Sequence, residues 1–123
     1  TEDKYGAGRL FGDFLKDKDR TTLYSLAKSE NLWERRVSIL ATFQFIYNKE
    51  TTDTYKIAEL LLRDKHDLIH KATGWMLREA GKRVSEAELL QFLDKYCKEM
   101  PRTMLRYSIE RLSPALKLKY MAK

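Results

Sequence analysis

Three similar segments recur 36 residues apart, and this repeat is the strongest constraint on the fold. They read LWERRVSIL, LIHKATGWM and MLRYSIERL, and they begin at Leu32, Leu68 and Met104. The next matched positions are Trp33, Ile69 and Leu105, then Val37, Thr73 and Ile109, then Leu40, Met76 and Leu112. Most of these positions are apolar, and cations crowd the positions between them. A helix-pair repeat of this length lies near the range of α-solenoids.

Helical periodicity extends through almost the whole chain, and no long strand-like alternation competes with it. Five Gly and two Pro in 123 residues also argue against an all-β fold, which needs many turn residues. We therefore predict an all-α fold, an α-α superhelix of the HEAT-like or ARM type. The helices are expected at residues 8–17, 20–29, 32–48, 53–64, 67–81, 86–99, 102–112 and 114–121.

Several of these helices have chemically sensible start signals. Asp19, Asp67 and Ser85 are expected to cap backbone N–H groups, and Glu88 stands where it would complete a capping box with Ser85. Ser113, followed by a proline, is expected to cap the last helix.

Composition limits the classes of function. The chain is long enough for one domain, and it has no apolar run that would span a membrane and no leader-like start. The single Cys97 excludes an internal disulfide and a thiolate metal cluster, so we expect a cytoplasmic protein. The net charge of +6 is compatible with a nucleic-acid partner.

The segment HKATGWMLREAGKR, residues 70–83, contains the most informative aromatic residue. Ile69, Ala72, Met76 and Ala80 form an apolar stripe that would face a core. Trp75 lies off this stripe, beside cations one turn before and one turn after it. It either packs against a neighbouring helix while the cations are solvated, or it belongs to a ligand-binding surface.

Cations recur on the helices expected to line one side of a solenoid. These cations are Arg35, Arg36, Lys71, Arg78, Arg102 and Arg106, and Trp75 lies among them on the same side. Cations spaced in this way suit a phosphate backbone, and an aromatic ring between them suits a sugar or a base. The alternative is a solvated charged face without a ligand.

Other site chemistries have little support in the sequence. His66 and His70 lie four residues apart, but no third ligand stands at helical spacing, so we expect no metal and no cofactor. The motifs of nucleotide hydrolases, dinucleotide-binding proteins and serine hydrolases are absent.

Taken together, SENLWERRVSILATFQFI, DKHDLIHKATGWMLREAGKR and MPRTMLRYSIERL resemble the AlkD-type DNA alkylation repair enzymes. This is a HEAT-like family of DNA glycosylases, and the similarity covers about residues 8–121. The resemblance implies a superhelix that holds duplex DNA in a basic concave cleft. It also implies excision of positively charged N3- or N7-alkylated purines without base flipping.

The resemblance assigns roles to individual residues. It implies that Arg36 holds the DNA backbone at the lesion, with Arg35 as its neighbour in the motif. Trp75 matches a tryptophan that packs against deoxyribose, and Arg78 matches a phosphate-contacting position. The family uses an aspartate to stabilise the developing oxocarbenium sugar, and Asp3 is the candidate for that role.

The resemblance departs from the family pattern at the N-terminus. Family members are about twice this length, and their aspartate follows a tryptophan that this chain lacks. We therefore expect residues 1–123 to form a single helical-repeat domain that corresponds to the C-terminal half of a family member. An uncovered solenoid end exposes apolar surface, which would allow self-association through residues 8–30.

Two other classes of function compete with a glycosylase. One is a catalytically inactive helical-repeat module that binds DNA or RNA, and the other is a protein-interaction scaffold. The first would bind nucleic acid with steep salt dependence but release no free methylpurine. The second would show no affinity for DNA at low salt.

Overall fold

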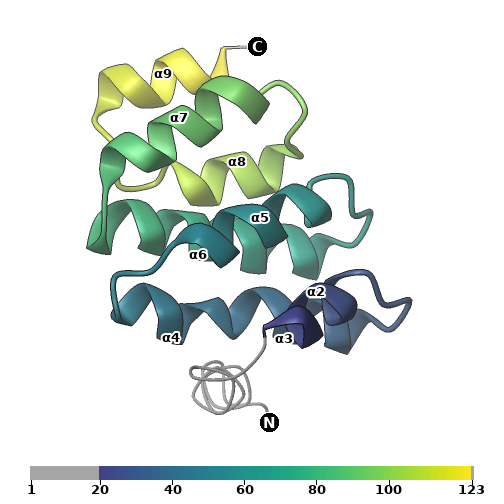
Figure 1. Cartoon of the computed structure of the whole chain (residues 1–123). Coiled ribbons are helices and arrows are strands. Elements are labelled where there is room, and N and C mark those ends of the chain that lie inside the picture. Colours follow the sequence, from purple (N-terminus) through teal and green to yellow (C-terminus); the bar gives the residue numbers. More distant parts are fainter. Residues whose placement is uncertain (1–19, 123) are drawn as a thin grey trace, which may run out of the picture.

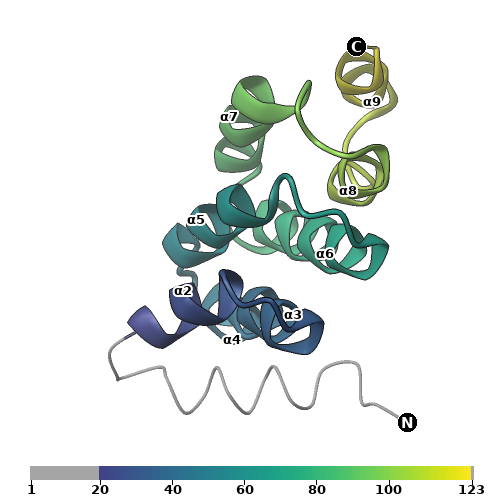
Figure 2. The same ribbon diagram turned by 90° about the vertical axis from the view of Figure 1, so that its right-hand side faces the viewer.

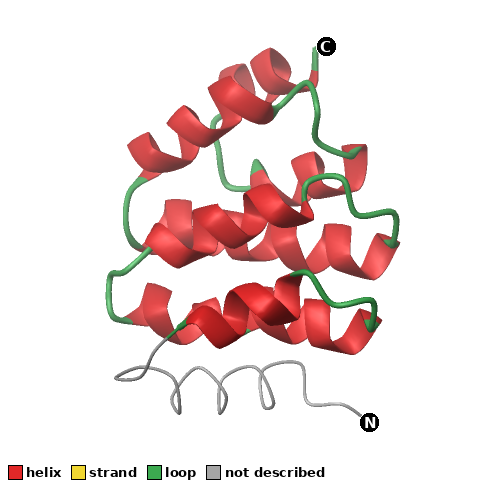
Figure 3. Cartoon of the chain, turned by 45° about the vertical axis from the view of Figure 1, so that its right-hand side comes forward, coloured by secondary structure: helices red, strands yellow, loops and turns green. Residues whose placement is uncertain are grey.

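A computed structural model describes residues 20–122 of the chain, and the part it describes is built from helices without strands (Figures 1 and 3). The helices, in chain order, are α2 (Thr21–Ala27), α3 (Leu32–Leu40), α4 (Thr42–Tyr47), α5 (Thr52–Leu61), α6 (Asp67–Arg83), α7 (Glu86–Tyr96), α8 (Arg102–Ser108) and α9 (Pro114–Met121). The all-α prediction is therefore confirmed. The helix expected at 8–17, the proposed cap Asp19 and much of the segment expected to self-associate lie outside the described residues.

The helices are arranged as successive pairs in two layers (Figure 2). The first helix of each pair, α2, α5 or α7, lies in one layer. The second helices, α3 with α4, α6 and α8, form the other, which we call the second-helix layer. Helix α6 is central, because it packs against α3, α4, α5, α7 and α8. This is the all-α helical-repeat architecture that the 36-residue repeat predicts.

The apolar stripe predicted on α6 is confirmed. Ile69, Met76 and Ala80 are fully buried and Ala72 is nearly so. These four residues pack with the core of α2–α5, while Leu77 on the adjacent face packs with the core of α7–α9. Helix α6 therefore joins the two apolar clusters.

Two helices end several residues before the periodic pattern of apolar residues in the sequence ends. Helix α7 ends at Tyr96 and α8 at Ser108, but Met100 and Leu112 beyond them are buried. Tight turns hold these residues on the core side, for example through the Leu112 N–H, which donates to the Ile109 carbonyl at 2.9 Å. The apolar period thus continues after the helix has ended.

The single helix expected over 32–48 is divided at Ala41 into α3 and α4. Two hydroxyls donate to carbonyls three residues earlier at 2.6 Å: Ser38 to Arg35, and Thr42 to Ile39. Such side-chain bonds compete with the helical ladder and bend helices.

The predicted caps are correct at two helices and wrong at one. The Ser85 and Ser113 hydroxyls accept the N–H groups of Glu88 and Leu116. At α6 the cap is His66, whose Nδ1 accepts the Leu68 N–H at 3.2 Å, and Asp67 is already the first helical residue.

The capping box expected at α7 is also not formed. The Glu88 carboxylate accepts the Thr51 hydroxyl at 2.8 Å, and the Ser85 N–H donates to the Ala80 carbonyl. A tertiary contact to the residue before α5 has therefore replaced the local one.

The 36-residue register holds for Leu40, Met76 and Leu112, which are all buried, but fails at the position of Trp33. Ile69 and Leu105 are buried, whereas Trp33, matched to them in the sequence, is 54% exposed. A register of 34 residues pairs the buried positions of α3–α4 and α6 instead; these pairs are Ile39 with Thr73, Thr42 with Met76, and Ile46 with Ala80.

Candidate functional site

A cavity of about 250 Å³ opens on the second-helix layer, between α3, α6 and α8. We call it the Trp75 cavity. It is lined by Arg36, Leu68, Lys71, Ala72, Trp75, Arg78 and Tyr107. Two aromatic rings and three cations therefore surround one hollow, and no carboxylate lines it among the described residues.

Trp75 both packs against a neighbouring helix and lines the cavity. Its ring lies 6.1 Å from the Phe43 ring of α4, centroid to centroid, with 33° between the planes. The side chain is only half-buried, because the apolar stripe of α6 turns away from this side. The indole thus contacts the core through Phe43 and also lines the cavity, a placement suited to contact with a ligand ring.

Arg36 approaches the cavity from α3. Its guanidinium carbon lies 5.6 Å from the centre of the Trp33 ring, a cation–π distance, and Trp33 is itself exposed. The exposed Trp33 ring is therefore a neighbour of the Arg36 guanidinium at the cavity.

The two cations contributed by α6 carry different ion pairs. Lys71 Nζ lies 3.3 Å from the Asp67 carboxylate in an exposed pair, which stabilises the helix only weakly. Arg78 is mostly buried, and its Nη atoms donate to Glu110 of the turn after α8 and to Glu79. Arg78 consequently ties α6 to the end of α8 as well as lining the cavity.

Glu79 carries a buried charge beside Arg78, one of the residues that line the cavity. Burial alone raises the pKa of its carboxyl group. The hydrogen bond from Arg83, and then the charges of Arg83 and Arg78, outweigh burial and bring that pKa below its ordinary value. Arg83 Nε donates to the carboxylate at 2.6 Å. Glu79 is therefore ionised in the folded protein and anchors the two arginines.

We expect Glu79→Gln to lower the free energy of unfolding at pH 7 by about 1–3 kcal/mol, because the two arginines lose their common carboxylate. The lowered pKa makes this contribution complete above the ordinary value of 4.5, and it is lost as pH falls through the folded-state pKa. Denaturant unfolding of parent and variant from pH 7 to pH 3 should show the difference shrink with acid. A constant difference would contradict the pairing.

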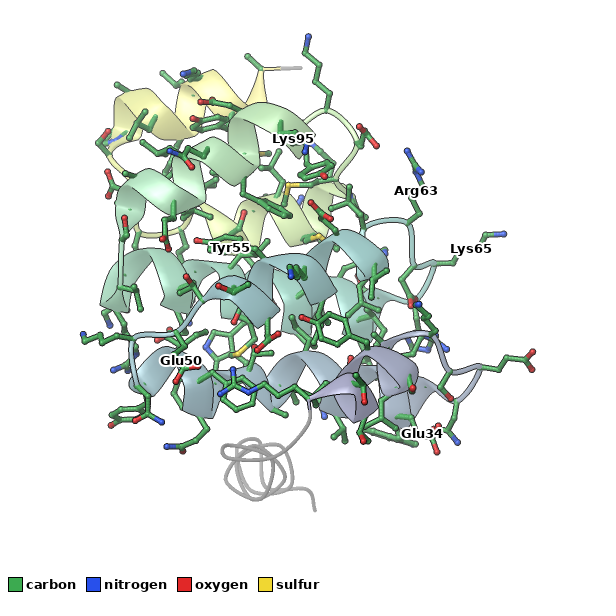
Figure 4. All side chains as sticks on the ribbon, in the orientation of Figure 1. Glu34, Glu50, Tyr55, Arg63, Lys65 and Lys95 are labelled. Atoms are coloured by element: carbon green, nitrogen blue, oxygen red, sulfur yellow. The ribbon has the colours of Figure 1, made fainter. Side chains whose placement is uncertain are left out.

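Arg35, predicted beside Arg36, lies outside the Trp75 cavity. Its Nε donates to the Asp64 carboxylate at 2.6 Å, and its Nη1 donates to the carbonyls of Ser29 and Glu30. It thereby ties the loop before α3 to the loop between α5 and α6. Side chains elsewhere in that second loop, those of Arg63 and Lys65, point away from the helices (Figure 4).

Two further predicted residues, Arg102 and Arg106, do not line the cavity. Arg102 Nη1 donates to the Met121 carbonyl at 3.0 Å and so holds the end of α9. Arg106 is exposed on α8 and is absent from the cavity lining. Asp3 lies outside the described residues.

The two histidines have structural partners. His66 caps α6, and His70 Nε2 forms a hydrogen bond with the Asp64 carbonyl in the preceding loop. Within residues 20–122, no group of three or more His, Cys, Asp or Glu side chains is placed to hold a metal ion. In the same part of the chain, no helix has the length and apolarity needed to cross a bilayer.

Three residues of the cavity lining, Leu68, Ala72 and Tyr107, are not among the predicted site residues. Tyr107 follows Lys71 by 36 residues, so the repeat itself contained the signal. Gly74 lies where α6 contacts α8. A Cβ atom at this position would lie 2.6 Å from both the Met104 carbonyl oxygen and the Tyr107 Cβ. The missing side chain therefore lets α8 approach α6 and bring Tyr107 beside the cavity.

The fold and this cavity define an all-α helical-repeat protein with a cationic, aromatic hollow on its second-helix layer. A family model described as "DNA alkylation repair enzyme" matches residues 5–112, most of the chain. The chain belongs to the DNA alkylation repair enzyme family, which supports a role in DNA repair. No curated protein and no solved structure gave a match.

Proposed function

We propose that this chain carries part of the site of a DNA glycosylase that removes positively charged N3- or N7-alkylated purines from duplex DNA. The observation that carries the proposal is the Trp75 cavity, in which an indole packed against Phe43 lies among Arg36, Lys71 and Arg78. Membership of the family makes DNA the expected ligand. Cations around an aromatic ring match the alternating chemistry of phosphate and sugar.

Cleavage of the glycosidic bond of such a purine needs little general acid catalysis. An alkylated purine is already cationic, so the electron pair of the breaking glycosidic bond neutralises the leaving base. Positive charge then develops on the sugar, and water adds to its anomeric carbon with loss of a proton. In this proposal the indole of Trp75 packs on the deoxyribose, and Arg36 holds a phosphate beside the lesion.

Arg78 would contribute by exchanging partners. Its guanidinium is held by Glu110, whose side chain is 58% exposed. A carboxylate that reaches solvent can swing away and leave the guanidinium to a phosphate. Lys71 forms only a weak ion pair with Asp67, so it can bind a phosphate with little loss of free energy.

The carboxylate of the reaction would come from outside the described residues. We propose Asp3 for this role, and we propose that the chain corresponds to the C-terminal half of a longer family member. The absence of a carboxylate among the described residues that line the Trp75 cavity favours a second candidate. That candidate is a module that binds DNA through the same cavity and excises nothing.

Release of free 7-methylguanine from methylated duplex DNA, measured by mass spectrometry, distinguishes the two candidates. The assay should be run on this chain and on a version extended at the N-terminus, with an Asp3→Asn variant of each. Release that depends on Asp3 supports the glycosylase. Binding of DNA without release from either chain supports the inactive module.

A further inference from the structure

A second cavity, of about 420 Å³, lies next to the first, between the end of α6, the start of α7 and the segment after α8. We call it the Lys82 cavity. Three cations line it, Arg78 and Lys82 from α6 and Arg111 from the turn after α8, against one carboxylate, that of Glu86. The ionisable side chains of its lining therefore give a net charge of +2.

Lys82 and Arg111 lack the ion pairs that Lys71 and Arg78 form with carboxylates. Both are exposed, and within residues 20–122 neither forms an ion pair or a side-chain hydrogen bond. Lys82 gains something from its place in the last turn of α6, where a cation complements the helix dipole. Arg111 is not in the last turn of α6, so it gains nothing from the dipole of that helix. It adds a second positive charge to the same cavity from a different part of the chain.

The two cavities share one lining residue, Arg78. Lys82 follows Trp75 by seven residues on the same helix, a rise of about 10 Å. That length corresponds to about three base pairs at 3.4 Å each along one strand. A backbone that passes the Trp75 cavity can therefore reach the Lys82 cavity within a few nucleotides.

We propose that the Lys82 cavity is a second phosphate site, which binds the backbone of duplex DNA about three base pairs to one side of the nucleotide at Trp75. This inference rests on the proposed function. Lys82 and Arg111 supply the charge, and they accept a phosphate without breaking an existing pair. Their role is to fix the register of the duplex on the second-helix layer rather than to act on the lesion.

The test uses the double variant Lys82→Gln/Arg111→Gln. Its matched control, Lys98→Gln/Lys117→Gln, removes the same charge from exposed cations outside both cavities. Binding is measured by fluorescence anisotropy with duplexes that contain an abasic-site analogue, at several salt concentrations. We expect the double variant to bind roughly tenfold more weakly than the control. The slope of log affinity against log salt should become shallower by about 1 for each phosphate that the variant no longer neutralises.

Duplexes shortened on one side of the lesion give a sharper readout. The parent should lose affinity when that flank becomes shorter than about three base pairs, and the double variant should show no such step. Equal affinity and equal salt slope for the double variant and the control would overturn the inference.

Two further outcomes have separate meanings. Thermal stabilisation of the parent, but not of the double variant, by inorganic phosphate at matched ionic strength, together with equal duplex binding by the double variant and the control, would assign the site to free phosphate and overturn the DNA assignment. A parent that binds no duplex at low salt would overturn the proposed function itself.

Discussion

Replacing Gly74 by alanine should unfold this protein at a temperature about 10 °C lower than the parent, from a loss of about 2 kcal/mol. The new Cβ would lie 2.6 Å from the Met104 carbonyl oxygen, which is backbone and cannot rotate away. Overpacking of this kind costs about 1–3 kcal/mol or more, and the better helix propensity of alanine returns at most about 1 kcal/mol. Thermal unfolding followed by circular dichroism measures the change.

Gly81 provides the matched control on the same helix. A Cβ there would first meet Leu89 Cδ2, at 2.5 Å, which is the flexible end of a side chain. Gly81→Ala should therefore cost clearly less than Gly74→Ala, because Leu89 can change rotamer while backbone cannot. Equal unfolding temperatures for the two variants would show that α8 does not depend on Gly74 for its approach to α6.

The contrast between these glycines illustrates what the sequence could predict. The period of Ile69, Ala72 and Met76 was sufficient to orient α6, since burial of an apolar stripe dominates the placement of an amphipathic helix. The same period placed Trp75 off the stripe, and the structure finds it half-buried at a cavity. Nothing local distinguishes Gly74 from Gly81, because the difference lies in the helix that each one meets.

Side-chain partners were the part that the sequence could not supply. Asp67 looked like a cap because its residue type favours that role, yet His66 caps α6. Glu88 looked like half of a capping box, yet it bonds Thr51. In both cases residue type indicated a chemistry, and three-dimensional neighbours decided which residue performed it.

The 36-residue repeat had a similar limit. It correctly matched the buried residues of α6 and α8, since Ile69 and Leu105 both face the core. At α3 it placed Trp33 in the core, whereas that residue is exposed beside Arg36. Small residues such as Ser38 occupy the core of α3 instead, and an apolar residue count gives them no weight.

Arg35 and Arg36 are neighbours in sequence with different surroundings, and their variants should separate stability from DNA binding. Arg36 lines the Trp75 cavity and lies over an exposed ring, so Arg36→Gln should lower the free energy of unfolding by no more than about 1 kcal/mol. Under the proposed function it should also reduce the rate of base release, or the affinity for an abasic analogue in an inactive chain, about 100-fold.

Arg35→Gln should have the opposite profile. It leaves the carboxylate of Asp64, only 7% exposed, without its guanidinium, and it releases the carbonyls of Ser29 and Glu30. We expect a loss of about 2 kcal/mol of stability, and near-parental DNA binding below the unfolding temperature. Denaturant unfolding and DNA titration on both variants provide the measurement. If Arg35→Gln weakened binding while Arg36→Gln left it intact, the Trp75 cavity would not be the DNA site, because only Arg36 lines it.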